Sequence, residues 1–151
     1  MFDLRDLYQQ VIVDHNKHPR NFGKLADFNH DADGYNPLCG DKLHVYLKVT
    51  SAGVIESVSF EGDGCAISVA SASLMTDALK GKTLQECEEM FGHFQHMATS
   101  ELDEAPDEEA LGKLTVLAGV REFPSRIKCA TLCWHTLHAA LQDSPEPAKT
   151  E

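Results

Sequence analysis

Residues 42–60 carry the pattern that most limits what this chain can fold into. Apolar and polar side chains alternate over residues 42–50, which predicts a strand with one buried face. Ser51-Ala52-Gly53 then supplies a turn, and residues 54–60 predict a second strand that returns antiparallel to the first. A two-stranded hairpin is marginal by itself, so other elements have to cover its apolar face.

The other regular patterns in the chain are helical. Apolar residues recur at helical spacing in segments bounded by glycine, proline or capping residues. The expected helices cover residues 4–15, 65–79, 83–94, 108–120 and 127–141. The segment between the first helix and Leu38 is polar and rich in turn formers, and it allows at most a short edge strand. We therefore expect an α+β fold with a small antiparallel sheet packed against helices.

The length of 151 residues fits one compact domain, which we place at residues 1–143. Residues 144–151 contain two prolines and no large apolar side chain, so we expect a disordered tail. Residues 95–122, here called the acidic insert, combine an exposed acidic loop with the helix expected at 108–120. Residues 86–109, which overlap the insert, hold nine acidic residues and no Lys or Arg, and they are either a solvated helix face and loop or a docking patch for a basic partner.

The charge of the chain limits its partners. Thirteen Lys and Arg stand against 24 Asp and Glu, a formal net charge of −11 that repels phosphate backbones and argues against nucleic acid. No apolar run reaches membrane-spanning length, and the first residues lack the pattern of a signal peptide. We expect a protein of the cytoplasm with no membrane partner.

Five cysteines, an odd number, argue against a disulfide framework and leave metal ligands, reactive thiols or packed core residues. Cys39 lies in a tight turn before the first expected strand, and Cys65 follows Gly62-Asp63-Gly64 at a strand-to-helix junction. Cys129 is expected in the first turn of the last helix. Helix N-termini lower thiol pKa values, and thiolate is the form that binds metals and attacks sulfur.

Asp41 stands two residues after Cys39, so strand geometry would place both side chains on one face. Together with two distant thiolates this pair would offer one oxygen and three sulfurs, a donor set suited to zinc or to an iron–sulfur cluster. Arg126 and Lys128 flank Cys129 and would offset its charge. Free cysteines are also common core residues, so spacing alone leaves both interpretations open.

Three motifs, in order, resemble the IscU/NifU-like family of iron–sulfur cluster assembly, and the SufU branch of it most closely. They are Asn36-Pro37-Leu38-Cys39-Gly40-Asp41, Gly62-Asp63-Gly64-Cys65-Ala66-Ile67-Ser68 and Arg126-Ile127-Lys128-Cys129-Ala130-Thr131-Leu132. The resemblance extends from the first helix to about Leu141. It implies a sheet of about three strands packed against four to six helices, and it implies that Cys39, Asp41, Cys65 and Cys129 are the metal-site residues.

Two departures from the scaffold members of that family favour SufU. Lys128 stands where scaffold proteins have a histidine, and no segment matches their Leu-Pro-Pro-Val-Lys chaperone motif. The chain between Cys65 and Cys129 is also longer, by roughly the acidic insert. The resemblance therefore implies a zinc-binding sulfur carrier, related to sulfurtransferases, that accepts persulfide sulfur from a SufS-like cysteine desulfurase and passes it to a downstream scaffold complex.

Within that resemblance we expect Cys39 to accept the sulfur, because a turn flanked by glycine moves more easily than a helix. The alternative function is a scaffold that builds an iron–sulfur cluster on the same residues and hands it on. A third possibility is a structural metal in a protein that only regulates its desulfurase.

Other polar residues are expected to play lesser roles. Cys87 has acidic neighbours, so we expect its thiol to be inert. Cys133 lies on the inward face of the last helix, so we expect a core thiol that is at most a reserve sulfur acceptor. Two histidine pairs at i, i+3 spacing, His93 with His96 and His135 with His138, are weak candidates for a second metal site. Asp14 and His15 are weak candidates for partner contact, and Arg126 for pairing with Asp41 or steering a persulfide.

Overall fold

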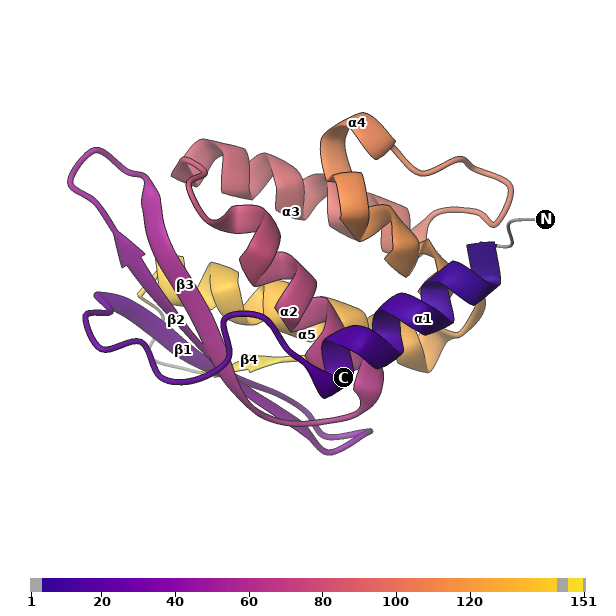
Figure 1. Ribbon diagram of the computed structural model, residues 1–151, viewed down its shortest axis with the longest axis horizontal. Helices are drawn as coiled ribbons and strands as arrows, with labels where there is room; N and C mark the ends of the chain where they lie inside the picture. Colours follow the sequence, from indigo (N-terminus) through magenta and orange to yellow (C-terminus); the bar gives the residue numbers. More distant parts are fainter. Residues whose placement is uncertain (1–3, 144–146, 151) are drawn as a thin grey trace.

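The computed structural model describes residues 4–143 and 147–150 (Figure 1). Along the chain its elements are α1 (Leu4–Lys17), β1 (His30–Asn36), β2 (Asp41–Val49), β3 (Ile55–Asp63), α2 (Ala66–Leu79), α3 (Leu84–Thr99), α4 (Glu108–Leu111), the 3₁₀ helix η1 (Gly112–Glu122), α5 (Pro124–Leu141) and β4 (Ala148–Lys149). No helix in these residues has both the length and the apolar character needed to cross a membrane.

The sheet has the order β3-β2-β1-β4. Its first three strands pair antiparallel, and the expected hairpin is its β2–β3 half. The α+β fold is confirmed, with four strands in place of about three, because β4 adds a short parallel pairing to β1. β1 is a seven-residue strand within the sheet, where the sequence had allowed only a short edge strand.

The fourth strand corrects the expectation of a disordered tail. Residues 144–146 and 151 lie outside the described part of the chain, but Ala148 and Lys149 pair with Gly34 and Tyr35 of β1. The Lys149 ammonium lies 5.4 Å from the centre of the Tyr35 ring. An open strand edge offers unpaired backbone groups, and this short segment uses them.

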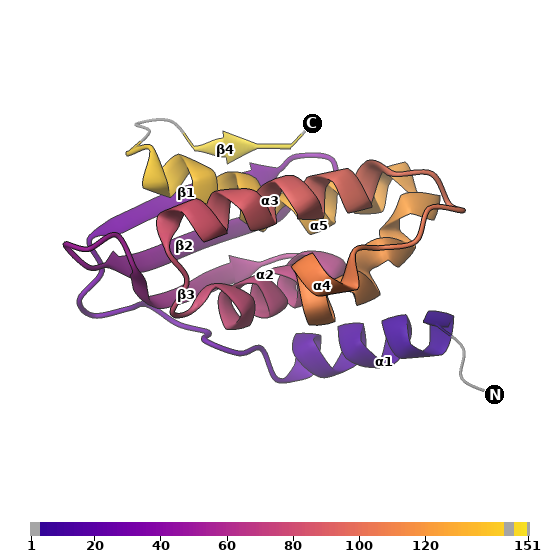
Figure 2. The ribbon, with the colours of Figure 1, turned by 90° about the horizontal axis from the view of Figure 1, so that it is seen from above.

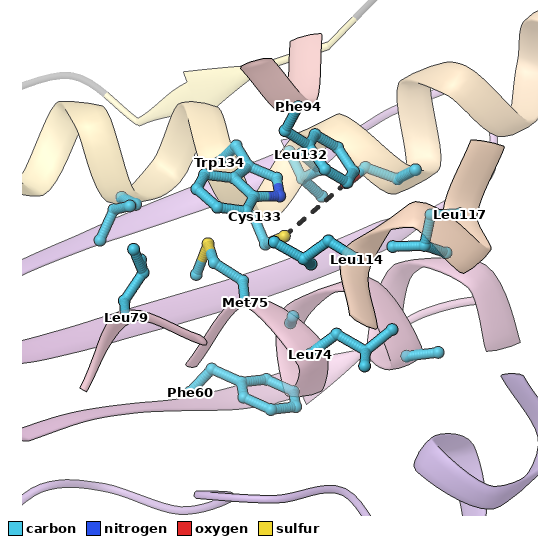
Figure 3. Close-up of a cluster of buried hydrophobic side chains, with 14 of the residues drawn as sticks. Phe60, Leu74, Met75, Leu79, Phe94, Leu114, Leu117, Leu132, Cys133 and Trp134 are labelled. Carbon is cyan, nitrogen blue, oxygen red and sulfur yellow. Dashed lines mark hydrogen bonds between the residues drawn. The ribbon is translucent and has the colours of Figure 1, made fainter. Parts of the chain in front are cut away.

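The helices gather on one side of the sheet, as Figure 2 shows. α2 and α5 pack directly on the strands and on each other, while α1, α3 and η1 pack on this inner pair. One hydrophobic cluster runs through the layers, with Trp134, Phe60, Phe94 and Met75 fully buried (Figure 3). The sheet and the inner helix pair therefore form one packed unit that fixes the position of everything at its ends.

The contact between β1 and α5 depends on a missing side chain at Gly34. A Cβ placed there would lie 1.9 Å from Thr136 Oγ1, far inside any real contact. Glycine therefore lets α5 approach the β1 backbone directly. As a result, β1 and the part of α5 around Thr136 are held at a short separation.

The helix expected at 108–120 is wrong beyond its first turn. α4 ends at Leu111, Gly112 takes a positive φ of 53°, and η1 continues as a 3₁₀ helix. α3 also runs five residues further than expected, to Thr99, beginning from the expected Thr83–Glu86 capping box. The acidic insert is therefore not only surface, because Leu114, Leu117 and Val120 are buried in the core.

The last helix begins at Pro124, three residues before the expected start. Proline suits the first helical position because its missing N–H has no intrahelical partner there. Cys129 is consequently the sixth residue of α5 and lies in its second turn. The expectation that Cys129 sits in the first turn, next to the free N–H groups, is wrong.

Candidate metal centre

Three loop or helix ends meet at one end of the sheet and bring the expected donor residues together. Sγ of Cys39, a carboxylate oxygen of Asp41 and Sγ of Cys129 all lie within 4.8 Å of one another. Cys65 is outside this group of three but adjoins it, with its Sγ 3.9 Å from Asp41 Oδ2. We call these four residues the four-donor cluster: Cys39, Asp41, Cys65 and Cys129.

The members of the cluster differ sharply in exposure. Cys39 is exposed on the loop between β1 and β2, next to Gly40, whose φ of +75° closes that turn. Cys129 is only 3% exposed and Asp41 is fully buried, while Cys65, the N-cap residue of α2, is intermediate. The site thus presents one accessible thiol above donors that the fold holds inside.

Asp41 is fixed by the chain that carries Cys65. The Cys65 backbone N–H donates to Asp41 Oδ1 over 2.7 Å. This contact needs Gly64, since a Cβ at that position would come within 2.8 Å of the same carboxylate oxygen. Glycine is therefore required at this position, because it allows the β3–α2 junction to close over the carboxylate.

The spacing of the donors fits a tetrahedral metal ion. Sγ of Cys39 and Sγ of Cys129 are 3.4 Å apart. Two sulfur ligands with zinc–sulfur bonds of about 2.3 Å lie about 3.8 Å apart in an ideal tetrahedron. The separation of Cys39 from Cys129 is close to this value, and Cys65 adds a third sulfur next to Asp41. Three sulfurs and one oxygen match the donor chemistry of zinc, and the same thiolates suit iron.

The thiols of Cys65 and Cys129 influence each other. Their hydrogen bond lowers the pKa of Cys65 to about 7, and it raises the pKa of Cys129, with burial acting in the same direction. The pair therefore gives up its first proton easily and its second reluctantly, as coupled thiols do. A cation between them would favour the doubly ionised form.

Arg126 does not pair with Asp41 as the sequence had suggested. Its guanidinium lies 4.2 Å from the centre of the Phe123 ring and is exposed, while Lys128 is partly buried beside Cys129. Tyr8 of α1 lies close to this arginine, and burial raises the pKa of Tyr8 while the positive charge of Arg126 opposes the rise. The sequence identified Tyr8 only as an apolar position of a helix.

Asn36 is the second residue that sequence reasoning missed. It is fully buried at the end of β1, and its side-chain amide donates to both Asp41 and Cys129. Its position three residues before Cys39, inside the first motif, was the signal available. A buried asparagine needs partners for its amide, and here they are members of the cluster.

The two remaining cysteines lie in apolar surroundings. Burial raises the pKa of Cys87 to about 12, as expected for an inert thiol. Burial likewise raises the pKa of Cys133 to about 12, and Figure 3 shows its sulfur within the core cluster. Cys133 is therefore a packed core thiol in this structure.

The histidines build no second centre. Within residues 4–143 and 147–150, neither expected pair belongs to a group of three or more donors that could hold a metal. His96 instead pairs with Glu104 over 2.8 Å, and His135 and His138 lie around the Phe91 ring. His15 is buried, with its Nδ1 2.7 Å from Ser73 Oγ, so the expectation that it contacts a partner is wrong. Asp14 is exposed and pairs with Arg20.

Comparison with known proteins gives a family match over most of the chain. The profile of the NifU-like N-terminal domain matches residues 7–130. The chain is 46% identical to the zinc-dependent sulfurtransferase SufU of Bacillus subtilis (strain 168) over 136 residues, which cover 89% of each protein. It is 40% identical to the iron–sulfur cluster assembly scaffold protein IscU of Streptococcus pyogenes serotype M1, over 93% of this chain and 86% of that one.

A solved structure shows the same architecture. A proposed iron–sulfur cluster assembly scaffold of the SUF system, from Fervidobacterium islandicum AW-1, superposes with a TM-score of 0.81 and 36% identity. The match covers 91% of this chain and 98% of that one. The similarity therefore extends over most of the chain, and the profile match at residues 7–130 includes all four members of the four-donor cluster.

Proposed function

The chain belongs to the family of NifU-like N-terminal domains and is a SufU/IscU-like protein of iron–sulfur cluster assembly; on that premise we propose that it is a zinc-dependent sulfur carrier. It accepts persulfide sulfur from a SufS-like cysteine desulfurase and passes it to a downstream scaffold complex in the cytoplasm. The SufU relative named above is described as a zinc-dependent sulfurtransferase, which supports this proposal. The donor set and its spacing support zinc independently.

The four-donor cluster holds the metal in this proposal. Asp41, Cys65 and Cys129 lie on packed elements and serve as its permanent ligands, with Cys39 as the fourth. Bound zinc supplies a positive charge that keeps thiols ionised and in fixed positions, without redox chemistry of its own. Arg126 and Lys128 add positive charge at the same helix end.

Cys39 is the sulfur acceptor because it is the exposed member of the cluster. Its thiolate attacks the outer sulfur of a persulfide on a desulfurase cysteine. A new S–S bond forms at Cys39, the old S–S bond breaks, and the donor cysteine leaves as a thiolate while the outer sulfur keeps its proton. The transfer is an exchange without net oxidation, so it needs no further reactant.

The exposed Cys39 beside buried Asp41 and Cys129 is the observation that carries this proposal. The test incubates the protein with a cysteine desulfurase and L-cysteine, then maps persulfides by alkylation and mass spectrometry. Cys39→Ala should abolish persulfide on the carrier, while Cys87→Ala, a matched change in a buried thiol, should leave it unchanged. Normal sulfur acceptance by Cys39→Ala, together with its loss in Cys129→Ala, would contradict this assignment.

The scaffold function remains the second candidate, since the IscU relative carries that name and thiolates also bind iron. Elemental analysis of the protein purified without added metal separates the two. About one zinc per chain, lost in Asp41→Ala, supports the sulfur carrier. Iron with acid-labile sulfide, in a brown protein, supports the scaffold.

A further inference from the structure

We propose that Asn36 is a positioning residue that selects which cluster members stay fixed. Its side chain holds Asp41 and Cys129 in place as metal ligands, and it does not restrain the Cys39 thiol, which can therefore dissociate from the metal. This inference rests on the proposed function, since it concerns how the same cluster divides into permanent and exchangeable ligands.

The hydrogen bonds of the Asn36 side chain carry the proposal. Its Nδ2 donates to Asp41 Oδ2 over 3.4 Å and to Cys129 Sγ over 3.6 Å. The same amide nitrogen therefore contacts members of the cluster from two different elements. Groups that hydrogen-bond to metal ligands orient them and tune the metal, and their loss typically weakens binding 10–100-fold.

Asn36 also holds the loop that carries Cys39, and these hydrogen bonds reach only backbone groups of the loop. Asn36 Oδ1 accepts from the Leu38 N–H over 3.2 Å, and the Asn36 carbonyl accepts from the Gly40 N–H over 2.9 Å. These contacts fix the base of the turn. The structure gives no hydrogen bond from Asn36 to the Cys39 thiol, whose contact in the cluster is Cys129.

The position of Asn36 is itself rigid. It is fully buried at the end of β1, paired in register with Asp41 of β2, and two residues from Gly34 where α5 meets the strand. A side chain anchored in a sheet can hold its partners more precisely than one on a loop. Asn36 thus transmits the fixed spacing of β1 and α5 to Asp41 and Cys129.

The experiment measures zinc affinity of the full chain by competition with a chelator of known affinity. Asn36→Asp keeps the size and the acceptor oxygen but removes both donors, and Asn36→Ala removes them without adding charge. Both should bind zinc 10–100-fold more weakly than the unchanged protein. Asn29→Asp is the matched control, since the Asn29 side chain bonds to the Val49 backbone at the other end of β2, and it should change affinity less than about 2-fold.

A spectroscopic measurement separates positioning from mere folding. With Co²⁺ in place of zinc, removal of a hydrogen bond to a thiolate should shift the sulfur-to-cobalt charge-transfer band to longer wavelength in both Asn36 variants, but not in Asn29→Asp. If neither variant folds, the side-chain amide signals of Asn36 in the unchanged protein should move on zinc addition while those of Asn29 stay. Absence of that movement overturns the proposal.

The outcomes distinguish this inference from the proposed function. Zinc affinity of Asn36→Ala equal to that of the unchanged protein overturns the role of Asn36, even if sulfur transfer proceeds through Cys39. A weaker Asn36→Asp with an unchanged Asn36→Ala also overturns it, because repulsion by the new charge then explains the loss. If both variants bind zinc weakly and the unchanged protein accepts no sulfur, the positioning role of Asn36 is supported and the sulfur-carrier function is refuted.

Discussion

Cys129 and Cys133 are two buried thiols one turn apart on α5, and they have opposite surroundings. Cys129 contacts Cys39 and Asn36 and belongs to the four-donor cluster. Cys133 contacts Ser71 Oγ over 3.5 Å and the Ala130 carbonyl oxygen over 3.7 Å, and the apolar core encloses the rest of its side chain. Both are at most 3% exposed, so burial alone does not distinguish a ligand from a core residue.

The difference lies in what reaches each position. At Cys129 the β1–β2 loop and the β3–α2 junction converge on the helix and bring polar donors with them. At Cys133 the helix meets the middle of α2, where apolar side chains fill the space. A reactive site in this fold therefore forms where chain connections meet, and a core forms where regular elements pack.

The largest expected effect is in thiol reactivity of the metal-free protein. Cys65, with its pKa lowered to about 7, should alkylate faster as the pH rises through 7, because only the thiolate reacts. Cys133, with its pKa raised to about 12, should stay unmodified. At pH 8 the ionised fraction of Cys65 should exceed that of Cys133 by more than about 100-fold. Mass spectrometry after timed alkylation measures both, and equal rates would remove the distinction between the two regions.

Exchange of alanine for each cysteine of α5 gives the next largest effect. Cys129→Ala removes a proposed ligand and should weaken zinc binding by at least about 100-fold, more than the loss of an outer partner. Cys133→Ala should leave zinc affinity unchanged but reduce the free energy of unfolding of the metal-free protein by about 1–2 kcal/mol, through a small cavity. Chelator competition and urea unfolding test this crossed pattern, which fails if either variant shows both losses.

The smallest expected effect is the loss of folding stability in acid that comes from the buried His15. Burial holds the pKa of His15 below its ordinary value, and Ser73 bonds to its ring. The unfolded chain then binds the proton more readily, so stability is complete above about pH 6.5 and falls as the pH drops below it. The loss is at most about 1.4 kcal/mol per pH unit for one such group. In urea unfolding without metal, the free energy of unfolding of His15→Gln should depend less steeply on pH than that of the unchanged protein. Equal pH dependence in the two proteins would show that other groups cause the loss of stability.

The sequence predicted the parts of the fold that have strong local signals. The β2–β3 hairpin, α2 and the capping box of α3 follow from alternation, helical spacing and cap residues. β1 was not assigned because its inward positions are Ala32, Gly34 and Asn36, which carry no hydrophobic pattern. Their burial comes from the approach of α5, a contact across about 100 residues that no local window contains.

The candidate site was predictable in its residues but not in its construction. Cys39 and Asp41 share a face by spacing, whereas only resemblance joined them to Cys65 and Cys129. The structure adds the distances that bring all four to one place. Asn36 was missed because its role depends on partners 5 and 93 residues away.

The long separation between the donors has a consequence for how the protein matures. Cys39, Asp41 and Cys65 are synthesised early, but Cys129 lies 90 residues after Cys39. Contacts between distant residues form slowly, because the chain must lose loop entropy before they form. A growing chain on the ribosome therefore carries an incomplete donor set until α5 has emerged and docked against β1. Tight metal uptake should thus mark the end of folding in this protein.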